Sequence, residues 1–137
     1  EILIGLVGSE MCIRDRTGTV QTGIYGDKAK AMGLPMFVPD DVHQERVMAA
    51  IYGPQGAKAG YTNGICREDL ISAAEYLVKT HGCNCLILGC TELPLILDES
   101  DDFEVAGSRV IVVDPTAALA RKVVKTAEDA YAATGIR

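Results

Sequence analysis

The feature that most constrains this fold is the uninterrupted apolar run at residues 85–89, Cys-Leu-Ile-Leu-Gly. A short run without polar interruption predicts a central parallel strand covered on both faces. Just before it, residues 67–80 show apolar side chains at the i, i+3, i+4 and i+7 spacing of a helix, with Gly82 placed to end that helix. A helix that leads directly into a buried strand predicts an α/β protein.

The same alternation of helix and strand continues on both sides of this unit. Before it, we predict a helix over 21–32, a buried strand over 36–38 and a helix over 41–52. The last of these is expected to place Val42, Met48, Ala49 and Tyr52 near its buried face. After it, we predict a strand over 109–113 and a helix from Asp114-Pro115 to about Ala133. The acidic stretch 98–104 is interpreted as a solvated connection. This order implies right-handed crossovers and a parallel sheet flanked by helices.

Length and charge exclude several classes of protein. The 137 residues suffice for one compact domain. With 13 Lys and Arg against 19 Asp and Glu, the net charge of −6 disfavours binding to nucleic acid. The early apolar run at residues 2–7 is far shorter than the roughly 20 residues of a membrane-spanning helix, so we predict no membrane segment. Five cysteines among ample apolar residues predict reduced thiols and a cytoplasmic location.

Residues 1–16 do not match the rest of the chain. The stretch from Glu10 to Arg16 has no periodicity and no turn pattern, and it back-translates to GAG ATG TGT ATA AGA GAC AGA. That string resembles the mosaic end of a transposase-based sequencing adaptor. We therefore interpret residues 1–16 as adaptor read-through, to be left out of the fold, and residues 17–137 as the native α/β portion of a longer protein.

The candidate site lies in the motif Leu-Gly-Cys-Thr-Glu-Leu-Pro at residues 88–94. The motif begins where the predicted strand ends, which is where ligands bind in open α/β sheets. A helix start after Cys90 would favour the thiolate through free N–H groups and the helix dipole. Thr91 offers a hydroxyl for a substrate carboxylate, and Glu92 offers a carboxylate for a substrate ammonium. From these residues alone, a buried structural cysteine is an equally good interpretation.

Three segments carry a family resemblance. The stretch Gly-Cys-Thr-Glu-Leu-Pro-Leu at 89–95 resembles the second catalytic-cysteine motif of the aspartate/glutamate racemase family. Residues 17–25, Thr-Gly-Thr-Val-Gln-Thr-Gly-Ile-Tyr, resemble the segment that opens the family's second domain, and 112–116, Val-Val-Asp-Pro-Thr, resemble its closing strand and helix start. The segments follow the family's order. Glu92, where cell-wall glutamate racemases usually carry His, points to the aspartate branch.

The resemblance implies the C-terminal lobe of a two-lobed, cofactor-independent enzyme that binds a small amino-acid substrate between its lobes. It assigns Cys90 as one of two opposed thiols that move the α-proton. It assigns Thr91, Thr19, Lys58 and Glu92 to substrate binding, with Lys58 at the distal carboxylate. Two bases are needed because a single base tends to return the proton to the face it left. Family members are often dimers, so a homodimer is one expected assembly.

The sequence also departs from the family. The Cys-Asn-Thr motif of the first domain is absent, and Cys83-Asn84-Cys85 does not replace it because it lacks the threonine and precedes the Cys90 strand. The chain therefore lacks the N-terminal lobe that the family supplies, and we expect the fragment alone to be inactive.

Other hypotheses stay open. Another cysteine-dependent isomerase or decarboxylase of small acids would use the same half-site, and a non-catalytic α/β binding domain would need Cys90 only as a core thiol. Zinc is disfavoured, because paired C-x-x-C spacings are missing and Cys85 falls within a strand, so no metal is expected.

Overall fold

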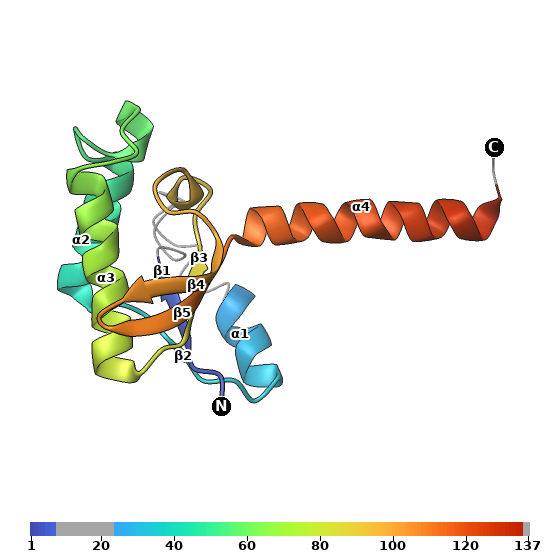
Figure 1. The fold of residues 1–137 in the computed structure, drawn as a ribbon, viewed down its shortest axis with the longest axis horizontal. Coiled ribbons are helices and arrows are strands. Elements are labelled where there is room, and N and C mark those ends of the chain that lie inside the picture. Colours follow the sequence, from blue (N-terminus) through green and yellow to red (C-terminus); the bar gives the residue numbers. More distant parts are fainter. Residues whose placement is uncertain (8–23, 136–137) are drawn as a thin grey trace.

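The computed structural model describes residues 1–7 and 24–135. Their framework is a five-stranded sheet in the order β2-β1-β3-β5-β4, parallel except for the pairing of β4 with β5 (Figure 1). The strands are β1 (Ile4–Val7), β2 (Met36–Phe37), β3 (Cys85–Leu88), β4 (Ser100–Val105) and β5 (Ser108–Val113). The helices are α1 (Ile24–Ala31), α2 (Asp41–Tyr52), α3 (Ile65–His81) and α4 (Pro115–Thr134), with the short 3-10 turns η1 (Ala57–Ala59) and η2 (Leu93–Leu95).

The helices lie on both sides of the sheet. Figure 1 shows α2 and α3 side by side along one face and α1 on the other, while α4 extends away from the body. This division follows from right-handed crossovers, since the chain moves from β1 to β2 in one direction and returns from β2 to β3 in the other. The core forms where α2 and α3 meet the sheet, with Ile51, Leu70, Leu77, Leu86 and Leu88 almost fully buried.

Local sequence signals place three helix ends correctly. The α2 helix starts after Asp40, whose side chain accepts a hydrogen bond from the His43 backbone N–H at 2.9 Å. The α4 helix starts after Asp114, which accepts in the same way from the Thr116 N–H at 2.9 Å. Gly82 ends α3 in the left-handed conformation, with φ of 67°. Each signal depends on one or two neighbouring residues, so it can be identified without knowledge of the tertiary structure.

The expectation of a solvated acidic connection at 98–104 is wrong. Residues Ser100–Val105 form β4, which pairs antiparallel with β5 across a two-residue turn. Both turn residues, Ala106 and Gly107, have positive φ (53° and 72°), as the tight hairpin turns that match strand twist require. The acidic side chains lie on an exposed edge strand, where charge discourages pairing with other chains.

Three other expectations about burial are corrected. The α2 helix buries Val47, Ala50 and Ile51 against α3, whereas Val42 and Tyr52 are exposed. The predicted buried strand at 36–38 is a two-residue edge strand, half-buried because it has one neighbour. The β3 strand is central but only alternate residues are fully buried, because α2 and α3 cover one face more completely than α1 covers the other.

Part of the segment interpreted as read-through belongs to the sheet. Ile4–Val7 form β1, which is buried throughout and pairs with both β2 and β3. The physical reason is its apolar sequence, which lies upstream of the adaptor-like codons that begin at Glu10. The fold of this chain therefore does not begin at Thr17. That residues 1–16 are not native to the gene stays a prediction.

Candidate functional site

Cys90 lies at the carboxyl edge of the sheet, two residues beyond the end of β3. There β1 and β3 are neighbours in register, with Val7 opposite Leu88, and the Gly89 N–H donates to the Val7 carbonyl at 2.8 Å. The chain leaves these two strands in opposite directions, toward β2 and toward β5. Such a topological switch point is where open α/β sheets bind their ligands.

Four sequence-predicted residues meet at this point. The Cys90 sulfur lies 2.7 Å from Glu92 Oε2, and the Thr91 hydroxyl donates to the same oxygen at 3.0 Å. The other carboxylate oxygen, Oε1, forms an ion pair with Lys58 Nζ at 2.9 Å. Both oxygens of Glu92 are thus engaged, and the carboxylate joins the sulfur to an ammonium from a distant part of the chain. We call Cys90, Thr91, Glu92 and Lys58 the Glu92 cluster.

A close backbone approach brings Lys58 to this cluster. Gly56 is buried, and a Cβ there would come within 2.8 Å of the Ala49 and Ala50 carbonyl oxygens. Only glycine lets the chain turn so tightly over the end of α2 and enter η1. The Lys58 ammonium also lies 5.2 Å from the centroid of the Tyr52 ring, within range of a cation–π contact.

The loop after Cys90 is anchored by two buried leucines and by a hydrogen bond from α3. Leu93 and Leu97 are buried in the core at 0% and 3% exposure. The Arg67 guanidinium, at the start of α3, donates to the Ile96 carbonyl at 2.6 Å. No pattern in the sequence identifies Arg67, because its partner lies 29 residues further along the chain. These contacts fix the path of the backbone that carries Glu92.

The ion pair shifts the pKa values of both partners in the expected directions. The hydrogen bond from Lys58 lowers the pKa of Glu92, partial burial opposes this, and the Thr91 hydroxyl adds to the lowering. The same hydrogen bond raises the pKa of Lys58. Glu92 is therefore a carboxylate and Lys58 an ammonium at neutral pH. The ammonium offsets the negative charge that the carboxylate would otherwise place beside the sulfur.

The cysteines differ from one another. Cys66, Cys83 and Cys85 are free thiols, as expected, but the expectation is wrong for Cys90, which is disulfide-bonded in this structure. Sequence alone does not show which sulfurs the fold brings within bonding distance. Burial raises the pKa of Cys83 to about 11 and also raises that of Cys85. Neither is therefore a useful base near neutral pH.

The predicted helix start after Cys90 is also corrected. The chain forms η2, a single turn over Leu93–Leu95, which opens at Glu92. So short a turn carries no macrodipole of the kind that would stabilise a thiolate. The charges near the Cys90 sulfur are therefore those of Glu92 and Lys58. Thr19, the remaining candidate, lies outside the described residues.

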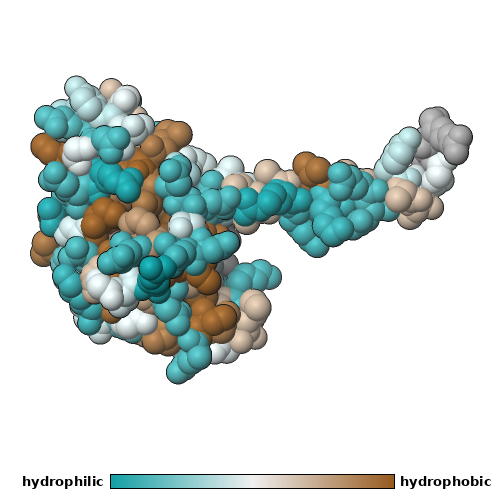
Figure 2. All heavy atoms as spheres, viewed as in Figure 1, coloured by the Kyte–Doolittle hydropathy of each residue, from teal (hydrophilic) through white to brown (hydrophobic). Residues whose placement is uncertain are grey.

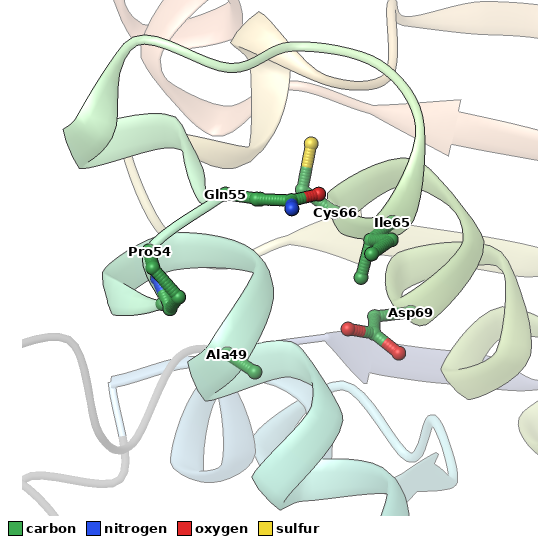
Figure 3. Close-up of a pocket in the computed structure, with 7 residues that line it drawn as sticks. Ala49, Pro54, Gln55, Ile65, Cys66 and Asp69 are labelled. Atoms are coloured by element: carbon green, nitrogen blue, oxygen red, sulfur yellow. The ribbon is translucent and has the colours of Figure 1, made fainter.

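A small cavity of about 140 Å³ opens between α2 and α3 (Figure 3). Its wall is mostly apolar, with Gln55 and Asp69 as its polar members, and it is lined by Ala49, Gly53, Pro54, Gln55, Ile65, Cys66 and Asp69. Asp69 is already engaged, because it accepts a hydrogen bond from the Arg46 guanidinium at 2.8 Å. The cavity contains no member of the Glu92 cluster.

Among residues 1–7 and 24–135, no three His, Cys, Asp or Glu side chains are grouped as they would be around a metal ion. Across the helices in that part of the chain, none is both long enough and apolar enough to cross a bilayer.

Comparison with known proteins links the chain to one family. Residues 16–123 match the model of the family described as Asp/Glu/hydantoin racemase. A relative from Pectobacterium carotovorum subsp. carotovorum, named only as an uncharacterized protein in the pnlA 3′ region, is 37% identical over 109 residues, which are 80% of this chain and 67% of the relative.

Two solved structures share the fold. One is an aspartate racemase homologue from Pyrococcus horikoshii OT3, with a TM-score of 0.66 and 24% identity over 91% of this chain. The other is a candidate Asp/Glu racemase from Yersinia pestis, with a TM-score of 0.56 and 24% identity over 81% of this chain. This chain spans 48% and 42% of their respective lengths, which is less than half of either protein.

Proposed function

This chain belongs to the Asp/Glu/hydantoin racemase family, and from that premise we propose that it is the Cys90-bearing half of a cofactor-independent racemase of aspartate or glutamate. The observation that carries the proposal is the Glu92 cluster, in which the Glu92 carboxylate lies 2.7 Å from the Cys90 sulfur and 2.9 Å from the Lys58 ammonium. An amino acid with a second carboxylate presents one group of complementary charge to each charged member.

In the proposed reaction, reduced Cys90 acts as a thiolate. It takes the Cα proton of the bound amino acid, so that the S–H bond forms as the C–H bond breaks and the electron pair passes into the adjacent carboxyl group. A thiol on the opposite side then delivers a proton to Cα, which inverts the centre. In the other direction, the Cys90 thiol donates. A thiol suits both roles because its ordinary pKa, about 8.5, lies near working pH.

The remaining cluster residues position the substrate. Glu92 accepts the substrate ammonium, and the exposed Lys58 ammonium, which now pairs with Glu92, turns toward the distal carboxylate. Thr91 donates its hydroxyl to the α-carboxylate, where negative charge builds up as the proton leaves. Thr19 is proposed as a second donor to that carboxylate. Donors placed before the reaction starts lower the barrier because they need no reorganisation.

The second proton carrier is proposed to come from a lobe outside this chain. Cys83 lies at the opposite end of β3 from the site, and Cys85 is the first residue of that strand. Neither is placed to face Cys90 across a substrate. The matched part of this chain covers only 42% and 48% of the two solved relatives, which leaves room in proteins of that length for a lobe that closes the site and excludes water.

The test uses the intact parent protein, obtained by reading the gene upstream of this chain, and is run with a thiol reductant. Circular dichroism follows racemisation of L-aspartate and L-glutamate, and deuterium incorporation at Cα follows proton exchange. We expect Cys90→Ser to abolish both signals, because a serine hydroxyl is too weakly acidic to exchange protons at neutral pH. Cys85→Ser, the matched control, should retain them. An unchanged rate in the Cys90→Ser protein would remove Cys90 from the reaction.

Thiol reactivity separates this proposal from a binding domain with a structural cysteine. After reduction, iodoacetamide should modify Cys90 at pH 8 faster than Cys83, whose pKa is about 11. Mass spectrometry of tryptic peptides gives the two rates in one sample. A Cys90 that reacts no faster than Cys83 would support the binding domain instead.

A further inference from the structure

Before a substrate binds, both oxygens of the Glu92 carboxylate have hydrogen-bonding partners. Oε1 pairs with Lys58 Nζ at 2.9 Å, and Oε2 accepts from the Thr91 hydroxyl at 3.0 Å. Oε2 also lies 2.7 Å from the Cys90 sulfur. An ionised carboxylate has no hydrogen to donate, so a hydrogen bond between these two atoms needs its hydrogen on the sulfur. In the reduced protein, Cys90 therefore donates to Glu92 as a thiol.

Of the two charges in the cluster, the negative one contacts the sulfur. Glu92 reaches the Cys90 sulfur through Oε2, whereas the ion pair with Lys58 is made by Oε1. A negative charge beside the sulfur disfavours the thiolate, and so does a hydrogen bond donated by the neutral thiol. The hydrogen bond from Lys58 lowers the pKa of Glu92, so Glu92 stays an ionised acceptor at neutral pH.

Charged groups on the neighbouring elements have partners of their own. The Arg67 guanidinium of α3 donates to a loop carbonyl at 2.6 Å, and Asp114, after β5, accepts from a backbone N–H of α4 at 2.9 Å. The Tyr52 ring, at the end of α2, lies 5.2 Å from the Lys58 ammonium. Among the described residues, Glu92 is thus the charged group in hydrogen-bond contact with the Cys90 sulfur.

We propose that Glu92 keeps reduced Cys90 in its thiol form until the ammonium group of an amino acid binds to that carboxylate. This inference rests on the proposed function, in which Glu92 accepts the substrate ammonium. When the ammonium binds, it replaces the S–H group as a partner of the carboxylate and places a positive charge beside the sulfur. The S–H bond then breaks, the proton passes to water, and the electron pair stays on the sulfur as the thiolate. The ligand class is an acidic amino acid with a free ammonium group.

The exposure of the cluster gives this arrangement a purpose. Lys58 and Thr91 are exposed and Glu92 is half-buried. The loops that carry them lie in the upper half of the body in Figure 1, where Figure 2 shows hydrophilic residues interspersed with hydrophobic ones. Water therefore reaches the cluster and can accept the proton. A permanent thiolate here would also be open to alkylation and oxidation, because the thiolate is the reactive form of cysteine.

The first test measures the rate at which iodoacetamide alkylates Cys90 in the 137-residue chain, kept reduced with a phosphine. Tandem mass spectrometry assigns the label to Cys90. At pH 7, we expect Glu92→Gln to react about fivefold faster or more, because the amide keeps the shape of the side chain but removes its charge. Glu75→Gln is the matched control, since it removes the same charge from a carboxylate that pairs with Lys79 on α3. It should leave the rate unchanged.

A pH profile separates this charge effect from a loosened loop. As the pH rises to about 10.5, the thiol ionises in both proteins, so the excess rate of Glu92→Gln should shrink. A loop that had merely opened would keep the variant faster by the same factor at every pH. A rate at pH 7 that is unchanged or slower in Glu92→Gln, or an excess that is constant with pH, would overturn the proposal.

The second test follows the proton that the substrate releases. Isothermal titration of L-aspartate into the reduced parent protein, in buffers of different ionisation enthalpy, should show release of a proton that the Cys90→Ser protein does not release. Equal release from both proteins would overturn the proposal. If Cys90→Ser abolishes racemisation while Glu92→Gln leaves alkylation unchanged, the proposed function stands and this role of Glu92 fails. If Cys90→Ser leaves racemisation intact, both fail.

Discussion

Lys58 Nζ lies 2.9 Å from Glu92 Oε1, although the two residues belong to different turns, η1 and the start of η2. From the sequence, Glu92 is predicted to bind a substrate ammonium, and the family resemblance assigns Lys58 to the distal carboxylate. The structure shows them bound to each other. In the proposed enzyme, substrate binding therefore exchanges an internal ion pair for two ion pairs with the ligand.

The first prediction concerns this ion pair. Lys58→Met should raise the pKa of Glu92, because the hydrogen bond from Lys58 is the largest cause of its lowering. Carbon-detected NMR titration of the glutamate carboxyl groups measures the change. Lys79→Met is the control, since Lys79 pairs at 2.7 Å with Glu75 on α3. It should leave Glu92 unaffected, and a Glu92 titration that is the same in both variants would contradict the prediction. Lys58 and Lys79 are exposed lysines, so we expect neither variant to change the free energy of unfolding greatly.

The second prediction concerns catalysis by the chain as it stands. The isolated 137 residues should not racemise aspartate or glutamate, because inversion needs a second proton carrier opposite Cys90. Binding of the substrate should also be weak without a second lobe to close the site. Circular dichroism of L-aspartate and deuterium incorporation at Cα are the readouts, against a buffer blank. Cysteine-dependent racemisation well above the blank would show that both bases are already present.

The third prediction tests the position of β1. A Cβ on Gly5 would come within 2.9 Å of Leu86 Cδ2 and 3.0 Å of Leu77 Cδ1. Gly5→Ala should therefore overpack the core and lower the free energy of unfolding by about 1–3 kcal/mol. Urea denaturation measures this. Gly26→Ala in α1 is the control, because its new Cβ meets only the flexible end of Met36 at 3.4 Å. If both variants unfold alike, β1 does not pack as an interior strand against Leu77 and Leu86.

The fourth prediction is a pH dependence of stability. Burial raises the pKa of Cys83 in the folded chain from 9.0 to about 11. The folded state thus holds the thiol proton more tightly than the unfolded state, so the stability from this site is fully present below pH 9 and lost as pH rises toward 11. Urea denaturation at pH 8 and pH 10.5 measures the loss. The Cys83→Ala chain should lose less stability over that interval, and an equal loss would exclude Cys83 as the source.

A fifth prediction concerns the junction between the two parts of the chain. Amplification from the source DNA should not give a product in which codons for residues 1–16 are joined to the codon for Thr17. The reason is the adaptor-like codon string that begins at Glu10. A clean genomic read through that junction would show that the segment is native.

Sequence by itself determined the features that depend on near neighbours. The spacing of apolar residues in α3, the cap residues Asp40 and Asp114, and the left-handed Gly82 all act within one or two turns. The apolar run of β3 likewise marks a central strand, and its end marks the edge where Cys90 lies. Such signals survive in the linear sequence because their causes are local.

Only the tertiary structure decided which distant groups meet. The hairpin of β4 and β5 turns at Ala106-Gly107, a pair without the usual Asn-Gly or Asp-Gly signal. The acidic sequence of β4 by itself predicts a loop, and only the pairing with β5 shows that it is a strand. The buried face of α2 is set by where α3 lies. The same holds for the pairing of Lys58 with Glu92, which requires the tight approach of Gly56 to the end of α2. Contacts of this kind depend on the packing of whole elements, which no short stretch of sequence encodes.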